Sequence, residues 1–243
     1  MCGRYAIAPR TVDAWATMGD LLGPEVEAML AALEPQFNVA PTTQVPIVIE
    51  DRATGKPKAV LARWGFIPYW WTDVAPPKAA TFNARSEEAA RKPMWRDAWT
   101  DSRCLIAATH WYEWRQDPAG KQPFALQPDG QAFMFAGLYS RWKPPGSDEW
   151  IYTAAILTRD AAPSIAHIHD RMPVILHPSA WNGWLDRMRR DRRAIDDILT
   201  VNTIMEARGY RISARVNSAR NTDSALLDPI DDDHAAPGEL PLR

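Results

Sequence analysis

RCLIAAT at residues 103–109 begins a run of short apolar segments that decides the fold, continued by PFALQ (123–127), AFMFAGL (132–138) and WIYTAAIL (150–157). Two similar segments come earlier, VPIVIE (45–50) and KAVLARW (58–64). Apolar or alternating runs of this length, separated by turn-forming residues, are typical of β-strands. The middle of the chain is therefore predicted to form a sheet.

Helical patterns lie on either side of these strands. Apolar residues recur with helical spacing over 12–22 and again over 24–33, where Pro24 occupies the first helical position. Two more helices are predicted near 178–189 and 191–206. Strands in a run with helices at the ends predict an α+β fold with a mostly antiparallel, barrel-like sheet. The chain shows neither a βαβ rhythm nor a glycine-rich phosphate loop, which argues against a nucleotide-binding fold.

Length and composition fit one large globular domain or two small ones, with a charged end. The chain has 243 residues, 46% of them hydrophobic, and a formal net charge of -2. Residues 228–243 hold five acids and one base, a balance of -4 that leaves +2 for the remainder. We expect a single domain over 2–227 and an acidic, flexible tail over 228–243. No apolar stretch would span a bilayer and MCGRYAIAPR lacks a signal-peptide core, so a cytoplasmic location is predicted.

Cys2 is the first candidate for chemistry, because loss of the initiator methionine would make it the N-terminal residue. Such a residue carries an α-amine with a pKa of about 8 and a thiol with a pKa of about 8.5 on adjacent carbons. An aldehyde can condense with the amine to an imine, and the thiol can then close a five-membered thiazolidine. From position alone, an incidental residue near a frayed terminus is the commoner case.

Acid–base candidates come from two further segments. WYEWR (111–115) places Glu113 among three aromatic residues, and enclosure by aromatics would raise the pKa of a carboxylic acid and suit a general acid. A surface strand with Glu113 pointing outward fits the pattern as well. AHIHDRMPVIL (166–176) holds His167 and His169. A histidine can carry a proton near neutral pH, but one packed and one solvated histidine is the simpler interpretation. Without a third ligand nearby, we expect no metal.

Asparagines and tryptophans mark a possible binding groove. QFNVAPT (36–42) and TFNARSE (81–87) contain Asn38 and Asn83, whose amides can orient a nucleophile or a sugar, although asparagine in turns is commoner. WGFIPYWW (64–71) predicts a loop with Trp70 and Trp71 exposed, and such rings stack on the bases of single strands. A core cluster is the alternative, since the chain has 12 tryptophans.

Seven motifs in one order resemble the SOS response-associated peptidase (SRAP) family. They are MCGRY (1–5), FNVAPT (37–42), WGFIPYWW (64–71), FNARSE (82–87), WYEW (111–114), HDRMPVIL (169–176) and ISARVNSARN (212–221). The resemblance runs from Cys2 to about Leu227. It implies a single α+β domain that binds single-stranded DNA and links covalently to abasic sites through a thiazolidine, in the SOS response to DNA damage.

Roles are carried over motif by motif. The resemblance implies that Cys2 is the nucleophile, that Asn83 positions the abasic sugar, and that Glu113 is the acid promoting sugar-ring opening. His169 resembles the active-site histidine of the family, whereas His167 does not align with it. The implied DNA-binding residues are Arg4, Asn38, Pro41, Trp70, Trp71, Arg85 and Arg171. Thr42-Thr43 stands where a glycine often follows the proline, and Arg220 where a lysine is common.

Three functions remain open at this stage. The first is the lyase-like crosslinking of abasic DNA, with self-processing of Met1. The second is a cysteine peptidase that uses Cys2, His169 and Glu113. The third is a non-catalytic single-strand-binding module. Crosslinking is favoured, because a thiazolidine requires an N-terminal cysteine and a peptidase nucleophile does not. We expect a monomer without cofactor or membrane contact, cytoplasmic and associated with the nucleoid when it acts on DNA.

Overall fold

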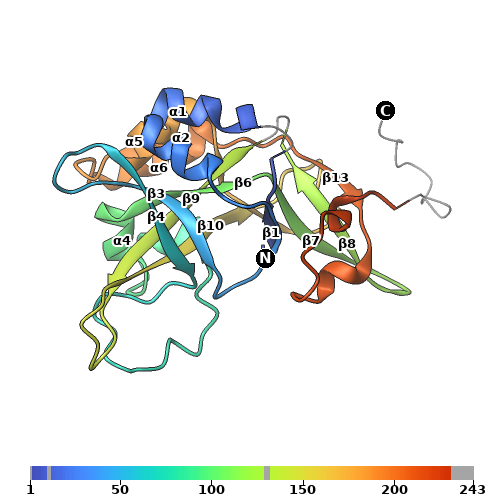
Figure 1. Ribbon diagram of the computed structural model, residues 1–243, viewed down its shortest axis with the longest axis horizontal. Helices are drawn as coiled ribbons and strands as arrows, with labels where there is room; N and C mark the ends of the chain where they lie inside the picture. The colour runs from blue at the N-terminus through green and yellow to red at the C-terminus, as the bar shows by residue number, and fades with distance from the viewer. Residues whose placement is uncertain (1, 10–11, 129–131, 231–243) are drawn as a thin grey trace.

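The computed structural model describes residues 2–9, 12–128 and 132–230, which contain thirteen strands, six α-helices and four short 3₁₀ helices (Figure 1). The strands are β1 (Tyr5–Ile7), β2 (Gln36–Val39), β3 (Gln44–Glu50), β4 (Pro57–Trp64), β5 (Asn83–Arg85), β6 (Arg103–Ala108), β7 (His110–Asp117), β8 (Gly120–Gln127), β9 (Phe133–Trp142), β10 (Ile151–Asp160), β11 (Arg171–Pro173), β12 (Ile175–Leu176) and β13 (Arg208–Arg211). The helices are η1 (Val12–Trp15), α1 (Ala16–Leu22), α2 (Pro24–Ala31), α3 (Ser86–Ala89), α4 (Arg96–Asp101), η2 (Pro178–Ala180), α5 (Trp181–Leu185), α6 (Arg192–Asn202), η3 (Ala214–Asn217) and η4 (Ser224–Leu227).

Five strands close into a barrel. Pairing runs from β10 to β4, β3, β6, β9 and back to β10, and only the β10–β4 pair in this ring is parallel. All five are among the six strands predicted from apolar runs, and every residue of β6 is buried. Closure leaves these strands without a free edge along the ring and lets their apolar side chains fill one interior. The predicted α+β fold with a barrel-like sheet is confirmed.

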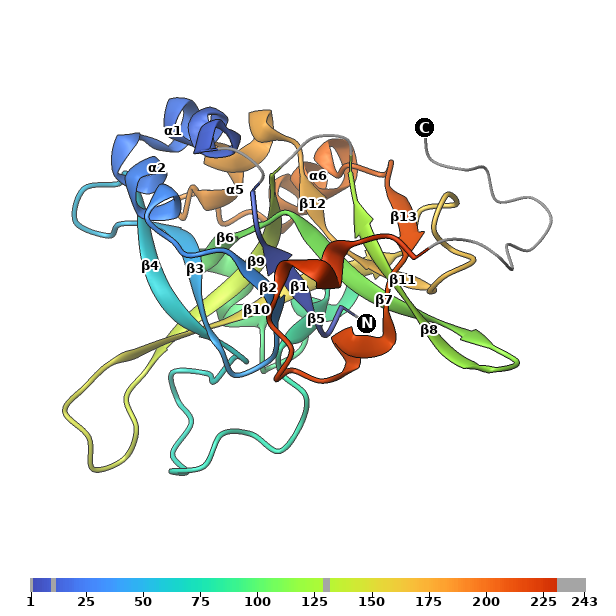
Figure 2. The ribbon, with the colours of Figure 1, turned by 45° about the vertical axis from the view of Figure 1, so that its right-hand side comes forward.

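A second, antiparallel sheet has the order β13–β8–β7–β1–β2. The strand β1 joins the sheet to the barrel, because the ring of Tyr5 packs edge-on against Trp64 of β4 at 5.0 Å and Phe135 of β9 at 5.7 Å between ring centroids. Figure 2 shows β1 and the start of the chain in front of the barrel strands. The N-terminal segment is therefore held between two rigid elements.

Helices cover one side of the barrel, with α1, α2 and α5 grouped at the upper left of Figure 1. The segment predicted as one helix over 178–189 is shorter, since η2 and α5 end where Asp186 adopts ψ of 96°. The helix predicted over 191–206 begins after the capping residue Asp191, and α6 ends at Asn202 because Thr203 bridges to Leu176. No described helix has the length and apolar character needed to cross a membrane.

The guanidinium of Arg103 ties the barrel to two helices. Arg103 begins β6 and is almost fully buried. Its nitrogens donate to five backbone carbonyls, those of Trp99, Thr100, Trp184, Asp186 and Arg189, which include the last turns of α4 and α5. Carbonyls at helix ends lack intrahelical donors, so this one side chain satisfies groups that would otherwise be buried without partners.

The packed chain continues slightly beyond the predicted domain end at residue 227. Pro229 forms a bridge with Ile212, and the backbone N–H of Ile230 donates to the carbonyl of Arg211. Residues 231–243, which make up most of the predicted acidic tail, lie outside the described residues, and its flexibility stays a prediction.

Candidate active site

Cys2 lies just before β1 and is completely buried. The side chain of Asn83 donates from Nδ2 to the Cys2 carbonyl at 2.7 Å, and the Cys2 thiol contacts the carbonyl of Arg4 at 3.7 Å. The same Arg4 carbonyl accepts from the backbone N–H of Tyr112 on β7. The position of Cys2 is thus fixed from both sheets, which contradicts the picture of an incidental residue at a frayed terminus.

Asn83 reaches Cys2 because of its place in the barrel. It begins the short strand β5, which pairs in parallel with β10 opposite Ile156. The amide oxygen Oδ1 of Asn83 is buried, and no described residue donates a hydrogen bond to it. A buried acceptor without a donor is costly, so this oxygen is available to a donor on Cys2 or on a bound sugar.

Glu113 points inward from β7, with only 2% of its surface exposed. The outward-facing alternative is therefore wrong. Burial raises the pKa of Glu113 from its ordinary value of 4.5 to about 7. Burial also raises the pKa of the Cys2 thiol well above its ordinary value, and the charge of nearby Glu113 adds to that effect. A carboxyl group that keeps its proton near neutral pH can act as a general acid beside Cys2.

His169 lies next to this acid. Its Nε2 is 3.8 Å from Oε2 of Glu113, and its Nδ1 accepts a hydrogen bond of 2.9 Å from the backbone N–H of Arg171. Burial lowers the pKa of His169, which favours the neutral ring. Oδ1 of Asp170 also lies 2.9 Å from Nδ1, so each ring nitrogen of His169 faces a carboxyl group. By contrast, His167 is exposed.

A cavity of about 410 Å³ opens at Glu113 and His169. It is also lined by Trp114, Lys121 and Asn217, and Nε1 of Trp114 donates to Oδ1 of Asn217 at 2.7 Å. Sequence reasoning did not single out Lys121 or Asn217. Asn217 lies inside the motif ISARVNSARN, which was a usable signal. Lys121 occupies a hairpin strand opposite Gln116, and only its pairing with the strand of Glu113 brings it here.

Two of the predicted DNA-binding residues are engaged within the protein. Nη1 of Arg4 donates to Oδ1 of Asn38 at 2.8 Å and to the carbonyl of Val216 at 2.9 Å. Nδ2 of Asn38 in turn donates to the carbonyls of Val216, Ser218 and Asn221. Arg4 and Asn38 therefore tie the segment around η3 to the N-terminus, so a role in binding DNA would come in addition to this structural one.

The remaining groove candidates differ in exposure. Trp70 is 43% exposed, Trp71 is half-buried, and their ring centroids are 6.2 Å apart, so the predicted core cluster does not include Trp70. Arg85 is exposed and Pro41 half-buried. Arg171 is almost buried, and its guanidinium pairs with the carboxylates of Glu87 at 2.9 Å and of Asp160. These contacts favour a structural role for Arg171.

Thr42 explains why a glycine suits the position after Pro41. Its φ is 79°, in the left-handed region that costs little for glycine and is strained for a β-branched residue. The backbone N–H of Thr42 donates to the carbonyl of Trp64 at 2.7 Å, so the turn is anchored to β4. The sequence departure at this point therefore stores strain without changing the path of the chain.

The geometry defines an α+β protein in which a cysteine, a buried carboxyl group with a raised pKa and a histidine lie where the N-terminal strand packs on a barrel. The family model described as SOS response associated peptidase (SRAP) matches residues 1–219, and the chain belongs to this family.

Relatives cover nearly the whole chain. The abasic site processing protein YoqW of Bacillus subtilis (strain 168) is 32% identical over 231 residues, 94% of this chain and 99% of YoqW. The abasic site processing protein YedK of Escherichia coli (strain K12) is 28% identical over 238 residues, 95% of this chain and 100% of YedK. A crystal structure of a Bacteroides thetaiotaomicron protein has the same fold, with a TM-score of 0.75, 24% identity, and coverage of 94% of this chain and 100% of that one.

Proposed function

We propose that this protein binds single-stranded DNA and captures abasic sites covalently, through a thiazolidine formed by Cys2 as the N-terminal residue after loss of Met1. The observation that carries the proposal is the burial of Glu113, which raises its pKa to about 7, beside a Cys2 whose carbonyl accepts a hydrogen bond from Asn83. The names of the relatives, abasic site processing proteins, support the choice of substrate. Met1 itself lies outside the described residues.

An acid is needed first, because the sugar of an abasic site is mostly a closed hemiacetal with no aldehyde. In the proposed step, Glu113 gives its proton to the ring oxygen as the bond from that oxygen to the anomeric carbon breaks, and the anomeric hydroxyl loses its proton to become the aldehyde. His169, neutral and 3.8 Å from Glu113, is suited to accept the proton that is released. The sugar would be held near Asn83 during this step.

Cys2 then captures the aldehyde by forming two bonds to its carbon, one from nitrogen and one from sulfur. The α-amine of Cys2 attacks the aldehyde carbon, and loss of one water leaves an imine. The Cys2 sulfur adds to the imine carbon while the thiol proton passes to nitrogen, which closes the ring. Because burial raises the pKa of this thiol, it stays protonated until the imine has formed, so the amine reacts first.

The same raised pKa argues against the peptidase alternative. Cysteine peptidases use a thiolate at neutral pH, which requires the thiol pKa to be lowered. Here burial raises the pKa of the Cys2 thiol well above its ordinary value. We therefore restrict any peptidase role to removal of Met1.

The test is the yield of crosslink with time on denaturing gels, using single-stranded DNA with and without an abasic site. Wild type should form a crosslink with abasic DNA only, and Cys2→Ala should form none while still binding DNA. Cys104→Ala is the matched control, because this second buried thiol lies in the barrel wall on β6. A stable crosslink of normal yield in Cys2→Ala would overturn the proposal.

A further inference from the structure

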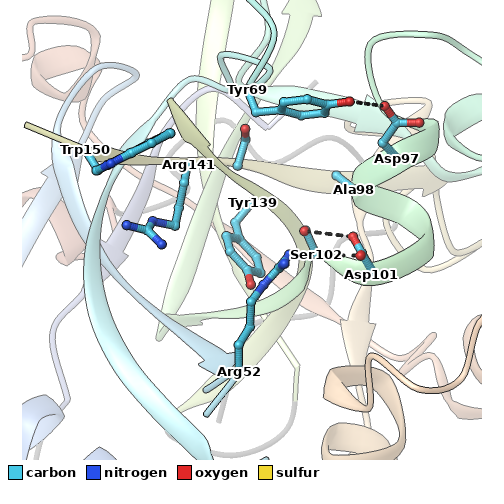
Figure 3. A pocket seen from close by; sticks show the side chains of 10 residues that line it. Arg52, Tyr69, Asp97, Ala98, Asp101, Ser102, Tyr139, Arg141 and Trp150 are labelled. Carbon is cyan, nitrogen blue, oxygen red and sulfur yellow. Dashed lines mark hydrogen bonds and ion pairs between the residues drawn. The ribbon is translucent and has the colours of Figure 1, made fainter. Parts of the chain in front are cut away.

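A second cavity, of about 430 Å³, lies outside the site built around Cys2 (Figure 3). Its walls come from β9, from α4 and the residue that follows it, from the 65–82 loop, from the loop that precedes β10, and from Arg52 in the turn between β3 and β4. Figure 3 shows Trp150 and Arg141 on one side of the opening and Asp97 and Asp101 on the other, with Tyr139 between them. The volume is within the range of ordinary small-molecule sites.

Arg141 brings an uncompensated positive charge to this cavity. Its guanidinium lies over the ring of Trp150 at 5.1 Å and over that of Tyr152 at 5.5 Å from the ring centroids. Among the described residues it has neither an ion pair nor a hydrogen bond. The acid Asp101, by contrast, already faces Arg52 at 4.0 Å and Arg190 at 3.7 Å. Arg141 is thus the group in this cavity that is ready to bind an anion such as a phosphate.

Aromatic and polar groups beside Arg141 suit a nucleobase. Tyr69 is 62% exposed and Trp150 53% exposed, although both are large rings that usually pack away from water. The hydroxyl of Ser140 is buried at the cavity wall and has no hydrogen-bond partner among the described residues. A base has a flat face for stacking and an edge with donors and acceptors, so it matches both features.

The cavity adjoins the turn that carries the predicted stacking rings. Tyr69 lines the cavity and directly precedes Trp70. Trp142, the neighbour of Arg141 on β9, donates from Nε1 to the carbonyl of Trp71 at 2.9 Å. In both Figure 1 and Figure 2 the 65–82 loop lies between the N-terminus and the loop that precedes β10. A single strand of DNA that runs from Cys2 across Trp70 would therefore reach this cavity next.

We propose that this cavity, the Arg141 pocket, holds a nucleotide of the bound single strand beyond the Trp70–Trp71 turn, with its phosphate against Arg141 and its base against Trp150. The inference rests on the proposed function, since it extends the same DNA path. A free nucleoside monophosphate offers the same chemistry, and the experiment separates it from a nucleotide within a strand.

The experiment measures the affinity of the full chain for intact oligothymidylates, which offer no aldehyde. One is short enough to cover only the Cys2 site and the other is several nucleotides longer. Wild type should bind the longer strand more tightly, and the ratio of the two affinities is the length advantage. Trp150→Ala should reduce this length advantage about fivefold or more. Arg141→Gln should reduce it too and lower the salt slope of binding by about one. Met188→Ala and Arg193→Gln, exposed and outside both sites, are the matched controls.

A length advantage that survives in both pocket variants overturns the inference. A second result would also overturn it: deoxythymidine monophosphate binds wild type but not Trp150→Ala, while the length advantage is the same in both proteins. The pocket would then bind a free nucleotide and not a nucleotide within a strand. Crosslinking of a short abasic strand at saturation should be equal in wild type and both variants. If no protein crosslinks while the length advantage depends on Trp150, the proposed chemistry fails and the pocket stands.

Discussion

Replacing Glu113 with glutamine should remove a pH-dependent cost that the buried carboxyl group imposes on folding. In the folded chain the pKa of Glu113 is about 7, against an ordinary value of 4.5 that we assign to the unfolded chain. Between these values the folded state keeps a proton that the unfolded state has lost. The contribution of Glu113 to the free energy of unfolding is therefore fully present below pH 4.5 and is lost as the pH rises through about 7.

The magnitude follows from the same two values. At about 1.36 kcal/mol per pKa unit, the difference between about 7 and 4.5 corresponds to about 3 kcal/mol. Glu113→Gln keeps the shape of the side chain and does not titrate. The free energy of unfolding of the variant relative to wild type should therefore rise by about 3 kcal/mol between pH of about 4.5 and about 8.

Urea unfolding of both proteins across this pH range measures that difference, and titrating groups that lie away from Glu113 cancel in the comparison. Glu149→Gln, exposed on the loop before β10, is the matched control. If the free energies of unfolding of wild type and Glu113→Gln change in parallel with pH, the pKa of Glu113 is not raised and Glu113 is not the acid in the mechanism. The crosslinking rate should agree: wild type should slow as the pH rises through about 7, and Glu113→Gln should be slower by about 10²–10⁴-fold where wild type is protonated.

Four other substitutions test further contacts. Asn83→Ala should slow crosslinking at saturating DNA, because Cys2 loses the bond to its carbonyl; an unchanged rate on denaturing gels would remove Asn83 from the site. Arg103→Met should lower the free energy of unfolding by about 3 kcal/mol or more in urea, since five carbonyls lose their donor, and a smaller loss would mean that water replaces it. Thr42→Gly should raise that free energy by about 1 kcal/mol by relieving the strained φ, whereas Thr43→Gly should not. Arg85→Gln should reduce the salt slope of single-strand binding by about one, and an unchanged slope would exclude a phosphate contact.

The barrel was predictable because its strands are continuous apolar runs. VPIVIE and RCLIAAT carry their own signal, and the paired strands β3 and β6 lie where these segments predict them. The strands β1, β5 and β13 have three or four residues each, too short for any periodicity, and they form only because neighbouring strands offer partners. Two of them, β1 and β5, nevertheless bring Cys2 and Asn83 into the site.

Part of the candidate site was predictable from the sequence and part was not. The order of the motifs predicted Cys2, Asn83, Glu113 and His169 as site residues, and the structure brings these four together. Alternation along β7 could not decide which way Glu113 faces, because both of its neighbours are bulky and apolar. Nor could sequence show that Arg171 pairs with Glu87 and Asp160, since Glu87 lies far away in the chain and Asp160 is opposite Arg171 only through the pairing of β10 with β11. Lys121 lies at the site only because its strand β8 pairs with β7, the strand that carries Glu113.

Thiazolidine formation at Cys2 can be tested by the mass of the peptide that carries the abasic sugar after digestion of the crosslinked protein. We expect an N-terminal peptide that lacks Met1 and is modified at Cys2. Its added mass should be that of the sugar fragment minus one water, and treatment with borohydride should add no hydrogen. A modified peptide that still begins with Met1, or a borohydride-trapped adduct on Lys121 in the same cavity, would contradict it.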